Sequence, residues 1–201
     1  MFVSYAVEGA TDTPVAEKLI QLVGGTPNRV LVAGGKAKLD PKVPGLNRVA
    51  QARPWFVLRD LDSDADCAPN LIGALLAPQA LSGRMCLRIA ERATESWLLG
   101  DATGFSDYFR VPITRVPDSP DALNRPKRQI VDLCRRSTHS SVRQAMVPRA
   151  SSGREVGPEY TSWLIDFARD CWDPTRAANR SPSLRRAIDR MTALVAAGCW
   201  A

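Results

Sequence analysis

Histidine is almost absent from this chain, and its cysteines form no metal-binding pattern. His139 is the only histidine among 201 residues, so metal sites and metalloprotease motifs that need several histidines are excluded. The five cysteines are odd in number and contain no CxxC pair, which argues against a zinc ribbon and a disulfide framework. We expect His139 in a loop and most cysteines as small apolar packing residues.

Long apolar runs are also missing. No stretch approaches the roughly 20 apolar residues that span a bilayer. The first residues, Met1 to Val7, lack the basic region and cleavage site of a signal peptide. With 45% hydrophobic and 24% charged residues, the composition is that of a globular protein. We therefore expect a cytoplasmic, single-domain protein without membrane contact.

Charge is unevenly distributed along the chain, which has a formal net charge of +6. Residues 1–109 hold 11 basic and 12 acidic side chains, residues 110–150 hold 9 and 3, and residues 151–201 hold 7 and 6. A basic middle segment attracts polyanions such as nucleic acids, and a solvated arginine-rich surface is the alternative interpretation. The candidate nucleic-acid-binding residues are Lys36, Arg125, Lys127, Arg128, Arg135, Arg136 and Arg143.

Strand and helix signals alternate through the first hundred residues. Strands are expected at 3–7, 29–33, 55–58 and 85–89, and helices at 14–23 (after an N-cap at Thr13), 70–77, 91–101 and 103–109. Residues 37–54 are expected to form a loop with at most one helical turn. This order predicts an α/β fold with a mainly parallel sheet flanked by helices. Helices at 126–136, 159–172 and from Ser181 onward fill the second half. We expect residues 1–109 to form the α/β core and residues 110–201 a helical extension packed on it within the same domain.

Acidic side chains follow two of the expected strands. Glu8 comes directly after the first strand, and Asp60 and Asp62 come after the third. The carboxyl ends of parallel strands line one crevice, and alternate residues of an extended chain point the same way, so these carboxylates are expected to converge. Carboxylates in one crevice repel unless a hard cation such as Mg²⁺ joins them. The competing interpretation is an exposed acidic loop that caps the next helix.

Three further residues have two interpretations each. Glu95 is either another metal-site carboxylate or a solvent-facing helix residue. Asp101 follows Gly100 and is either a ligand or a cap for the helix expected at 103–109. Lys36 follows two glycines at a strand end and either contacts a phosphate or is a solvated loop lysine.

The chain resembles the Toprim family at several motifs that occur in the family's order. Glu8-Gly9 with Thr11-Asp12, and later Asp60-Leu61-Asp62, are similar to the signature found in topoisomerases, bacterial primases, recombination proteins and OLD-type (overcoming lysogenisation defect) nucleases. VEGATD, LRDLDSD, RIAERATESWLLGD and the late segment VGPEYTSWLIDFARDCWDP more closely resemble a bacterial Toprim-like family of unknown function. Its members often lie beside ATPase genes in phage-defence loci, and the resemblance covers most of the chain.

This resemblance implies roles for individual residues. Glu8 would be a metal ligand or a general acid/base, and Asp60 and Asp62 would hold Mg²⁺ (or Mn²⁺). Glu95 matches the family glutamate that precedes a tryptophan, and Asp101 matches the aspartate that closes that motif, so both would contribute to a second ion position.

The chain departs from the family pattern at two positions. Ala93 stands where family members often carry an acidic residue, and Arg59 stands where an apolar residue is common. Both departures bear on the second metal position.

The function implied by the resemblance is a Mg²⁺-dependent nuclease that hydrolyses DNA or RNA in a phage-defence or DNA-processing system. Nucleic acid and an ATPase would be its partners. Two other functions stay open at this point. One is a catalytically silent module that binds nucleic acid or an ATPase. The other is a small-molecule phosphohydrolase or nucleotidyl transferase that uses the same carboxylates.

Overall fold

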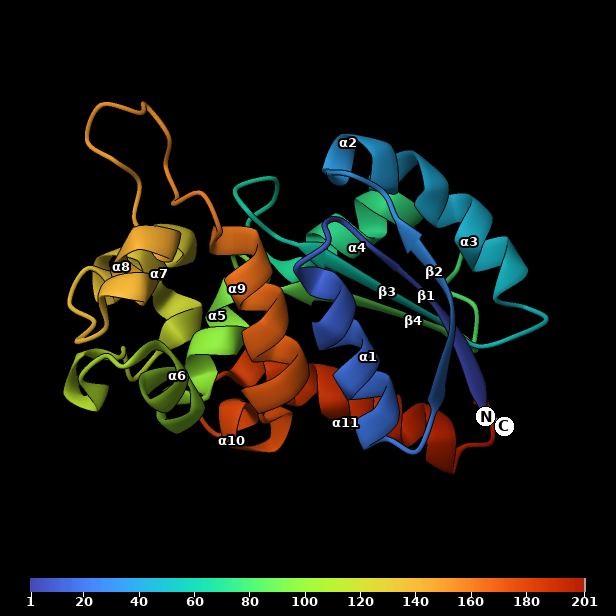
Figure 1. The fold of residues 1–201 in the computed structure, drawn as a ribbon. Coiled ribbons are helices and arrows are strands. Elements are labelled where there is room, and N and C mark those ends of the chain that lie inside the picture. Colours follow the sequence, from blue (N-terminus) through green and yellow to red (C-terminus); the bar gives the residue numbers. More distant parts are fainter. Residues whose placement is uncertain (201) are drawn as a thin grey trace.

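A four-stranded sheet forms the centre of the computed structural model, which describes residues 1–200 (Figure 1). The strands are β1 (Phe2–Val7), β2 (Thr26–Val32), β3 (Trp55–Asp60) and β4 (Met85–Ala90). They lie in the order β2-β1-β3-β4, and every pairing is parallel. The predicted α/β class with a parallel sheet is confirmed.

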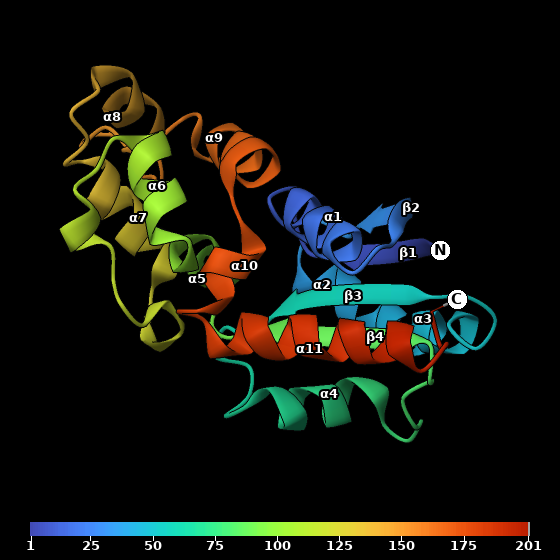
Figure 2. The same ribbon diagram turned by 90° about the horizontal axis from the view of Figure 1, so that it is seen from below.

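Helices cover both faces of the sheet, as Figures 1 and 2 show. The first face is covered by α1 (Asp12–Leu22) and α11 (Pro182–Ala196), and the second by α2 (Lys36–Leu39), α3 (Val43–Val49) and α4 (Ala68–Leu76). Along β1, Val3 and Tyr5 face the first layer and Ala6 faces the second. Since β1, β3 and β4 are buried on both faces, they read as nearly continuous apolar runs, whereas the edge strand β2 is mostly exposed.

The other helices lie beyond the carboxyl ends of the strands (Figure 2). They are α5 (Thr94–Gly100), α6 (Ala102–Phe109), α7 (Pro126–Cys134), α8 (Ser140–Met146), α9 (Tyr160–Asp166) with a π-helical turn at Phe167–Cys171, and α10 (Pro174–Ala178). Their buried side chains join the core that fills the α1 face of the sheet. One direct link is the Trp97 indole, which donates a hydrogen bond to Ser183 Oγ at 2.7 Å.

The prediction of a loop with at most one helical turn over 37–54 is wrong, because this stretch forms α2, a 3-10 turn at Asp40–Lys42 and α3. Leu39, Val43 and Leu46 are buried at helical spacing against the second face of the sheet. Pro41 and Pro44 suggested a loop, but each lies in the first turn of a short helix, where proline leaves no hydrogen bond unmade.

Three other local predictions need correction. The N-cap is not Thr13, because α1 already begins at Asp12. Strand β2 begins at Thr26, earlier than predicted; Pro27 obscured the pattern, and an edge strand tolerates proline. The helix α8 was not predicted, because Val142, Ala145 and Met146 are its only buried residues. The exposed His139 stands at the N-cap position of that helix.

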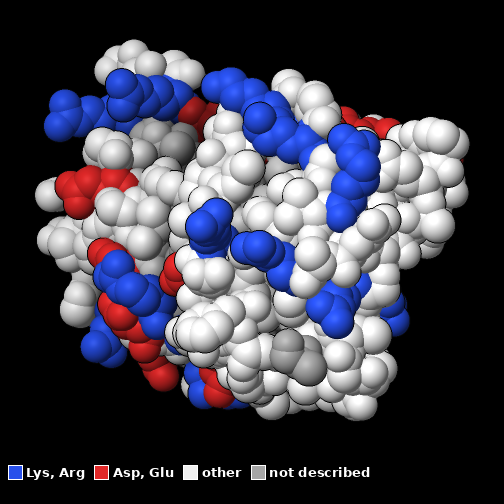
Figure 3. All heavy atoms as spheres, turned by 90° about the vertical axis from the view of Figure 1, so that its right-hand side faces the viewer, with Lys and Arg blue, Asp and Glu red and all other residues white. Residues whose placement is uncertain are grey.

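Basic side chains are not confined to the basic middle segment, residues 110–150. Residues 22–59 hold seven lysines and arginines and one aspartate, Asp40. Figure 3 shows Lys and Arg side chains spread over the face that carries the amino ends of the strands, with most acidic side chains toward its margins. Positive charge is therefore present on more than one face, and binding experiments need charge-matched controls.

All five cysteines are free thiols. Cys86 and Cys134 are buried and the half-buried Cys199 packs against the core, as expected of small apolar packing residues, whereas Cys171 is exposed. No helix among residues 1–200 combines the length and hydropathy needed to cross a membrane.

Candidate active site

The carboxyl ends of β1 and β3 bring two predicted site residues into direct contact. Glu8 follows β1, and Asp60 is the last residue of β3. Glu8 Oε1 accepts a hydrogen bond from the backbone N–H of Asp60 at 2.9 Å. The chain leaves β1 toward β2 on one side and returns to β3 on the other, so these residues stand at the topological switch point, where α/β proteins bind ligands.

Asp60 is held in place by the start of α5. Its Oδ1 atom accepts hydrogen bonds from the backbone N–H of Thr94 at 2.9 Å and from the Thr94 hydroxyl at 2.8 Å. Because Thr94 is the first residue of α5, the positive end of the helix faces the carboxylate. The residue next to Thr94 is Glu95, which is also buried.

Asp12 is a site residue that the sequence interpretation did not select. It opens α1, is only 5% exposed, and accepts a hydrogen bond from the Gly9 N–H at 2.9 Å. Burial, followed by the charge of Glu95, raises the pKa of Asp12 to about 6. An acidic residue in the first helical turn, four positions after the strand-end Glu8, was the available signal.

The carboxylates at the strand ends share a repulsive environment. Burial raises the pKa of Asp60 well above its usual range, and the charges of Asp12, Glu95 and Glu8 raise it further. Burial also raises the pKa of Glu8, although the hydrogen bond from Asp60 and the positive charge of Arg59 act to lower it. The carboxyl groups therefore disfavour one another's charged forms, and a bound cation would relieve the repulsion.

Glu95 connects the carboxylates at the strand ends to helices α7 and α9. Its carboxylate is buried, so the solvent-facing interpretation is wrong. Glu95 Oε1 accepts a hydrogen bond from the Tyr160 hydroxyl at 3.3 Å and lies 3.9 Å from the Lys127 ammonium. Burial, followed by the negative charge of Glu95, raises the pKa of Tyr160 well above its usual range, so the phenol stays protonated and donates.

Asp62 does not continue the strand as expected. The strand ends at Asp60, and Asp62 has a left-handed backbone with φ 50°. Its carboxylate pairs with the Lys36 ammonium at 2.9 Å, and Lys36 also contacts Asp64 at 2.8 Å. Lys36 therefore neutralises the rim of the site, and its ammonium is already engaged by two carboxylates.

Arg59, which departs from the Toprim pattern, neutralises the site from beneath. Its side chain is 2% exposed and pairs with Asp40 at 2.9 Å, Asp64 at 2.6 Å and Glu8 at 3.5 Å. Burial alone would lower the pKa of Arg59, but hydrogen bonds to Asp40 and Asp64 raise it. A buried guanidinium surrounded by carboxylates thus replaces the apolar residue common in that family.

Asp101 lies apart from these carboxylates. It caps α6 by accepting a hydrogen bond from the Gly104 N–H at 3.0 Å, and it also accepts the Asp173 N–H at 2.9 Å. Two hydrogen bonds from Arg176, at 2.9 and 2.8 Å, complete its partners. Although burial opposes the shift, these donors hold the pKa of Asp101 below its usual value. The capping interpretation is confirmed.

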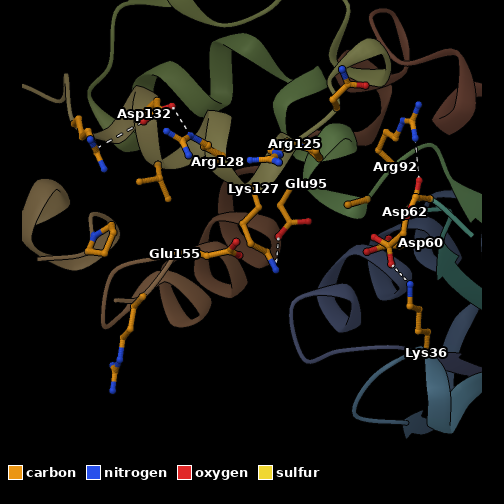
Figure 4. Close-up of a pocket in the computed structure, with 18 residues that line it drawn as sticks. Lys36, Asp60, Asp62, Arg92, Glu95, Arg125, Lys127, Arg128, Asp132 and Glu155 are labelled. Atoms are coloured by element: carbon orange, nitrogen blue, oxygen red, sulfur yellow. Dashed lines mark hydrogen bonds and ion pairs between the residues drawn. The ribbon is translucent and has the colours of Figure 1, made fainter. Parts of the chain in front are cut away.

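A pocket of about 730 Å³ opens in front of Asp60 and Glu95. Its lining includes the cationic residues Lys36, Arg92, Arg125, Lys127, Arg128, Arg135 and Arg154 and the acidic residues Asp60, Asp62, Glu95, Asp132 and Glu155. Figure 4 shows Lys127 extending to Glu95, while Asp60 and Asp62 lie together beside Lys36. We call the cations on and beside α7 (Arg125, Lys127, Arg128 and Arg135) the basic wall.

The pocket separates the predicted nucleic-acid-binding residues into two groups. Lys36 and the basic wall line it, whereas Arg136 and Arg143 do not. Arg143 instead donates a hydrogen bond to the Ser137 carbonyl at 2.5 Å. Arg92 and Arg154 line the pocket but were not selected from the sequence, because neither belongs to the basic middle segment.

The donor chemistry of the cluster fits a hard divalent cation, since Glu8, Asp12, Asp60 and Glu95 all offer carboxylate oxygens. The positions of these side chains, however, do not form a metal site. Within residues 1–200, no three His, Cys, Asp or Glu side chains are grouped closely enough to hold a metal ion as they stand. Binding would therefore require these side chains to change rotamer.

Comparisons with known proteins leave the family open. A scan against protein-family models, a search of curated proteins and a search of solved structures each found no match for this chain. The case for a function therefore depends on the geometry and charge of the site.

Proposed function

We propose that this protein is a Mg²⁺-dependent, Toprim-like nuclease that hydrolyses phosphodiester bonds of DNA or RNA. The observation that carries the proposal is the contact between Glu8 and Asp60 at the switch point, with the pocket and its basic wall in front of it. A carboxylate cluster suits a hard cation, and the basic wall suits backbone phosphates. The single histidine does not limit this chemistry.

The roles follow from the position of each side chain. Asp60, Asp12 and Glu95 would hold Mg²⁺ or Mn²⁺, and Asp62 would join them if it releases Lys36. A divalent ion held there would stabilise the attacking and leaving oxygens of a phosphodiester.

The other roles fall to Glu8 and the basic wall. Glu8, whose pKa is raised by burial, would accept or deliver the proton. The basic wall would hold phosphates without reading bases. Asp101 has no part in the proposal, because its oxygens are engaged elsewhere.

The cellular setting is proposed from the resemblance. We propose a cytoplasmic enzyme in a phage-defence or DNA-processing system, working with an ATPase partner. Five free thiols are compatible with a reducing compartment.

The test is cleavage of supercoiled plasmid and of labelled DNA and RNA oligonucleotides with Mg²⁺ or Mn²⁺. The wild type should cleave at least one substrate, and chelation by EDTA should stop it. Asp60→Asn should remove cleavage, whereas the exposed Asp107→Asn should retain it. Equal cleavage by the Asp60 variant would reject the mechanism.

One observation favours a second candidate, a catalytically silent binding module. The carboxylates are not grouped as a metal site among residues 1–200, and Asp62 is already neutralised by Lys36. Such a module would bind nucleic acid through the basic wall but show no heat of Mg²⁺ or Mn²⁺ binding by calorimetry. Measurable heat that disappears in Asp60→Asn would favour the nuclease instead.

A further inference from the structure

An arginine on the outermost strand β4 is left without a partner. Arg88 pairs in register with Leu58 of β3, and β4 ends the strand order. Its neighbours two positions away, Cys86 and Ala90, face the layer that contains α11, so Arg88 points to that layer too. The Arg88 Nε atom is buried and makes no hydrogen bond within residues 1–200. A buried donor without an acceptor is uncommon and calls for an explanation.

Two arginines of α11 lie close to Arg88. Helix α11 packs against β4, and Arg186 and Arg190 are one helical turn apart on the same side of that helix. Burial lowers the pKa of Arg88, and the charges of Arg186 and Arg190 lower it further. Burial raises the pKa of the Cys86 thiol to about 12, while the charges of Arg88 and Arg190 oppose this. The packing of α11 against β4 brings these charges to the side of the strand on which Arg88 lies.

Carboxylates do not balance these three charges. Among residues 1–200, Arg88 and Arg190 form no ion pair, and Arg186 contacts only Glu91, at 3.3 Å. Arg88 differs from the other arginines in its burial: among residues 1–200, its Nε is the one buried arginine nitrogen that makes no hydrogen bond. The three guanidiniums on β4 and α11 therefore carry uncompensated positive charge around a partly buried donor.

We propose that Arg88, Arg186 and Arg190 form a second anion site, separate from the pocket, that takes a phosphate group. Guanidiniums offer paired N–H donors that match phosphate oxygens. The Arg88 Nε–H would gain its missing acceptor.

The phosphate has two sources. It belongs to a free phosphate or phosphate monoester, or to the backbone of a nucleic acid that continues from the pocket. The second source rests on the proposed function, and the structure offers a route for it. Arg186 contacts Glu91, and the next residue, Arg92, lines the pocket.

The experiment compares Arg88→Gln and Arg190→Gln with Arg185→Gln, a control that removes the same charge from the same helix. Arg185 is exposed, and its guanidinium donates to Asn179 Oδ1 at 2.9 Å. Titration with inorganic phosphate at constant ionic strength is followed by NMR chemical shifts and thermal unfolding. Binding of a labelled single-stranded oligonucleotide is followed by fluorescence anisotropy in EDTA, so that neither arm depends on cleavage or metal.

If the phosphate is free, the phosphate-induced shifts and stabilisation should disappear in the Arg88 and Arg190 variants and persist in Arg185→Gln. If it belongs to a strand, oligonucleotide affinity should fall about tenfold in both variants, with a salt dependence reduced by about one phosphate. Equal behaviour of all three variants in both arms would overturn the site and leave these arginines as protection of an exposed edge strand. Because Arg190 is exposed, its variant keeps the test valid if Arg88→Gln fails to fold.

Discussion

Glu8 Oε1 accepts a hydrogen bond from the backbone N–H of Asp60 at 2.9 Å, across 52 positions of sequence. The anchor of Glu8 is therefore the main chain of Asp60 and not its side chain. Replacing the Asp60 carboxylate removes a candidate ligand without releasing Glu8, so Asp60→Asn separates loss of chemistry from loss of structure.

The first prediction concerns pH. The pKa of Asp12 is about 6 in the folded protein and about 3.9 in an unfolded chain. Because folding raises it, its contribution to stability is present below about pH 4 and is lost as the pH rises through about 6. Without divalent ions, we expect the unfolding free energy to fall by about 2 kcal/mol between pH 4 and 7 from this group. In Asp12→Asn, the fall in unfolding free energy between pH 4 and 7, measured by urea denaturation, should be smaller.

Asp107→Asn is the matched control for that measurement, because Asp107 is exposed. An Asp12 variant with the pH dependence of the wild type would contradict the assignment of a buried, proton-binding carboxyl at the start of α1.

The second prediction separates Asp101 from the metal site. Asp101→Asn should cost about 2–4 kcal/mol of stability, because it weakens the cap of α6 and the ion pair with Arg176. Heat of Mg²⁺ binding should be unchanged. Thermal unfolding and calorimetry on the same sample check both statements, and a selective loss of ion binding would return Asp101 to the ligand set.

The third prediction compares two helical glycines. A Cβ at Gly100 would lie 2.7 Å from the Ala177 carbonyl oxygen, whereas a Cβ at Gly73 would have no neighbour within 4 Å. Gly100→Ala should destabilise the protein by about 1–3 kcal/mol despite the better helix propensity of alanine. Gly73→Ala should stabilise it by about 0.5–1 kcal/mol. Denaturation midpoints of the two variants should move in opposite directions; a shared direction would contradict the close approach of α5 and α10.

The fourth prediction concerns the basic wall. The double variant Arg125→Gln/Arg128→Gln should weaken oligonucleotide binding about tenfold, because both residues line the pocket. The charge-matched pair Arg136→Gln/Arg143→Gln lies outside it and should change affinity much less. Fluorescence anisotropy at fixed salt measures both. Similar losses in the two variants would mean that net charge, and not the pocket, determines binding.

The sequence was sufficient for much of the fold, because hydrophobic period and strand-end chemistry are local signals. Apolar runs such as Trp55–Leu58 and the polar residues after them located the sheet and its carboxyl edge. Short helices that depend on tertiary burial were missed, as at 37–54, where prolines dominated the local pattern. The start of α1 was misplaced because no side chain caps this helix, which begins at Asp12 and not after Thr13.

The site was predictable only in part. The parallel topology of the strands predicted that Glu8 and Asp60 lie close together. It did not predict which basic side chains pair with the carboxylates. Nothing local reveals that Lys36 pairs with Asp62, that Arg59 lies beneath Glu8, or that Arg176 engages Asp101. These pairings join residues far apart in the chain, so they depend on how the layers pack.

The continuous core described above bears on how the pocket selects what enters it. The acidic residues of the pocket lie at strand ends, and the basic wall lies on and beside α7. Strands and helix are joined by one continuous set of buried side chains that includes Leu58 and Ile130. Close-packed interiors deform little, so the distance across the opening is fixed during folding and is not adjusted by closure of one half onto the other. A ligand of this pocket would accordingly be discriminated by its size and by the spacing of its charges.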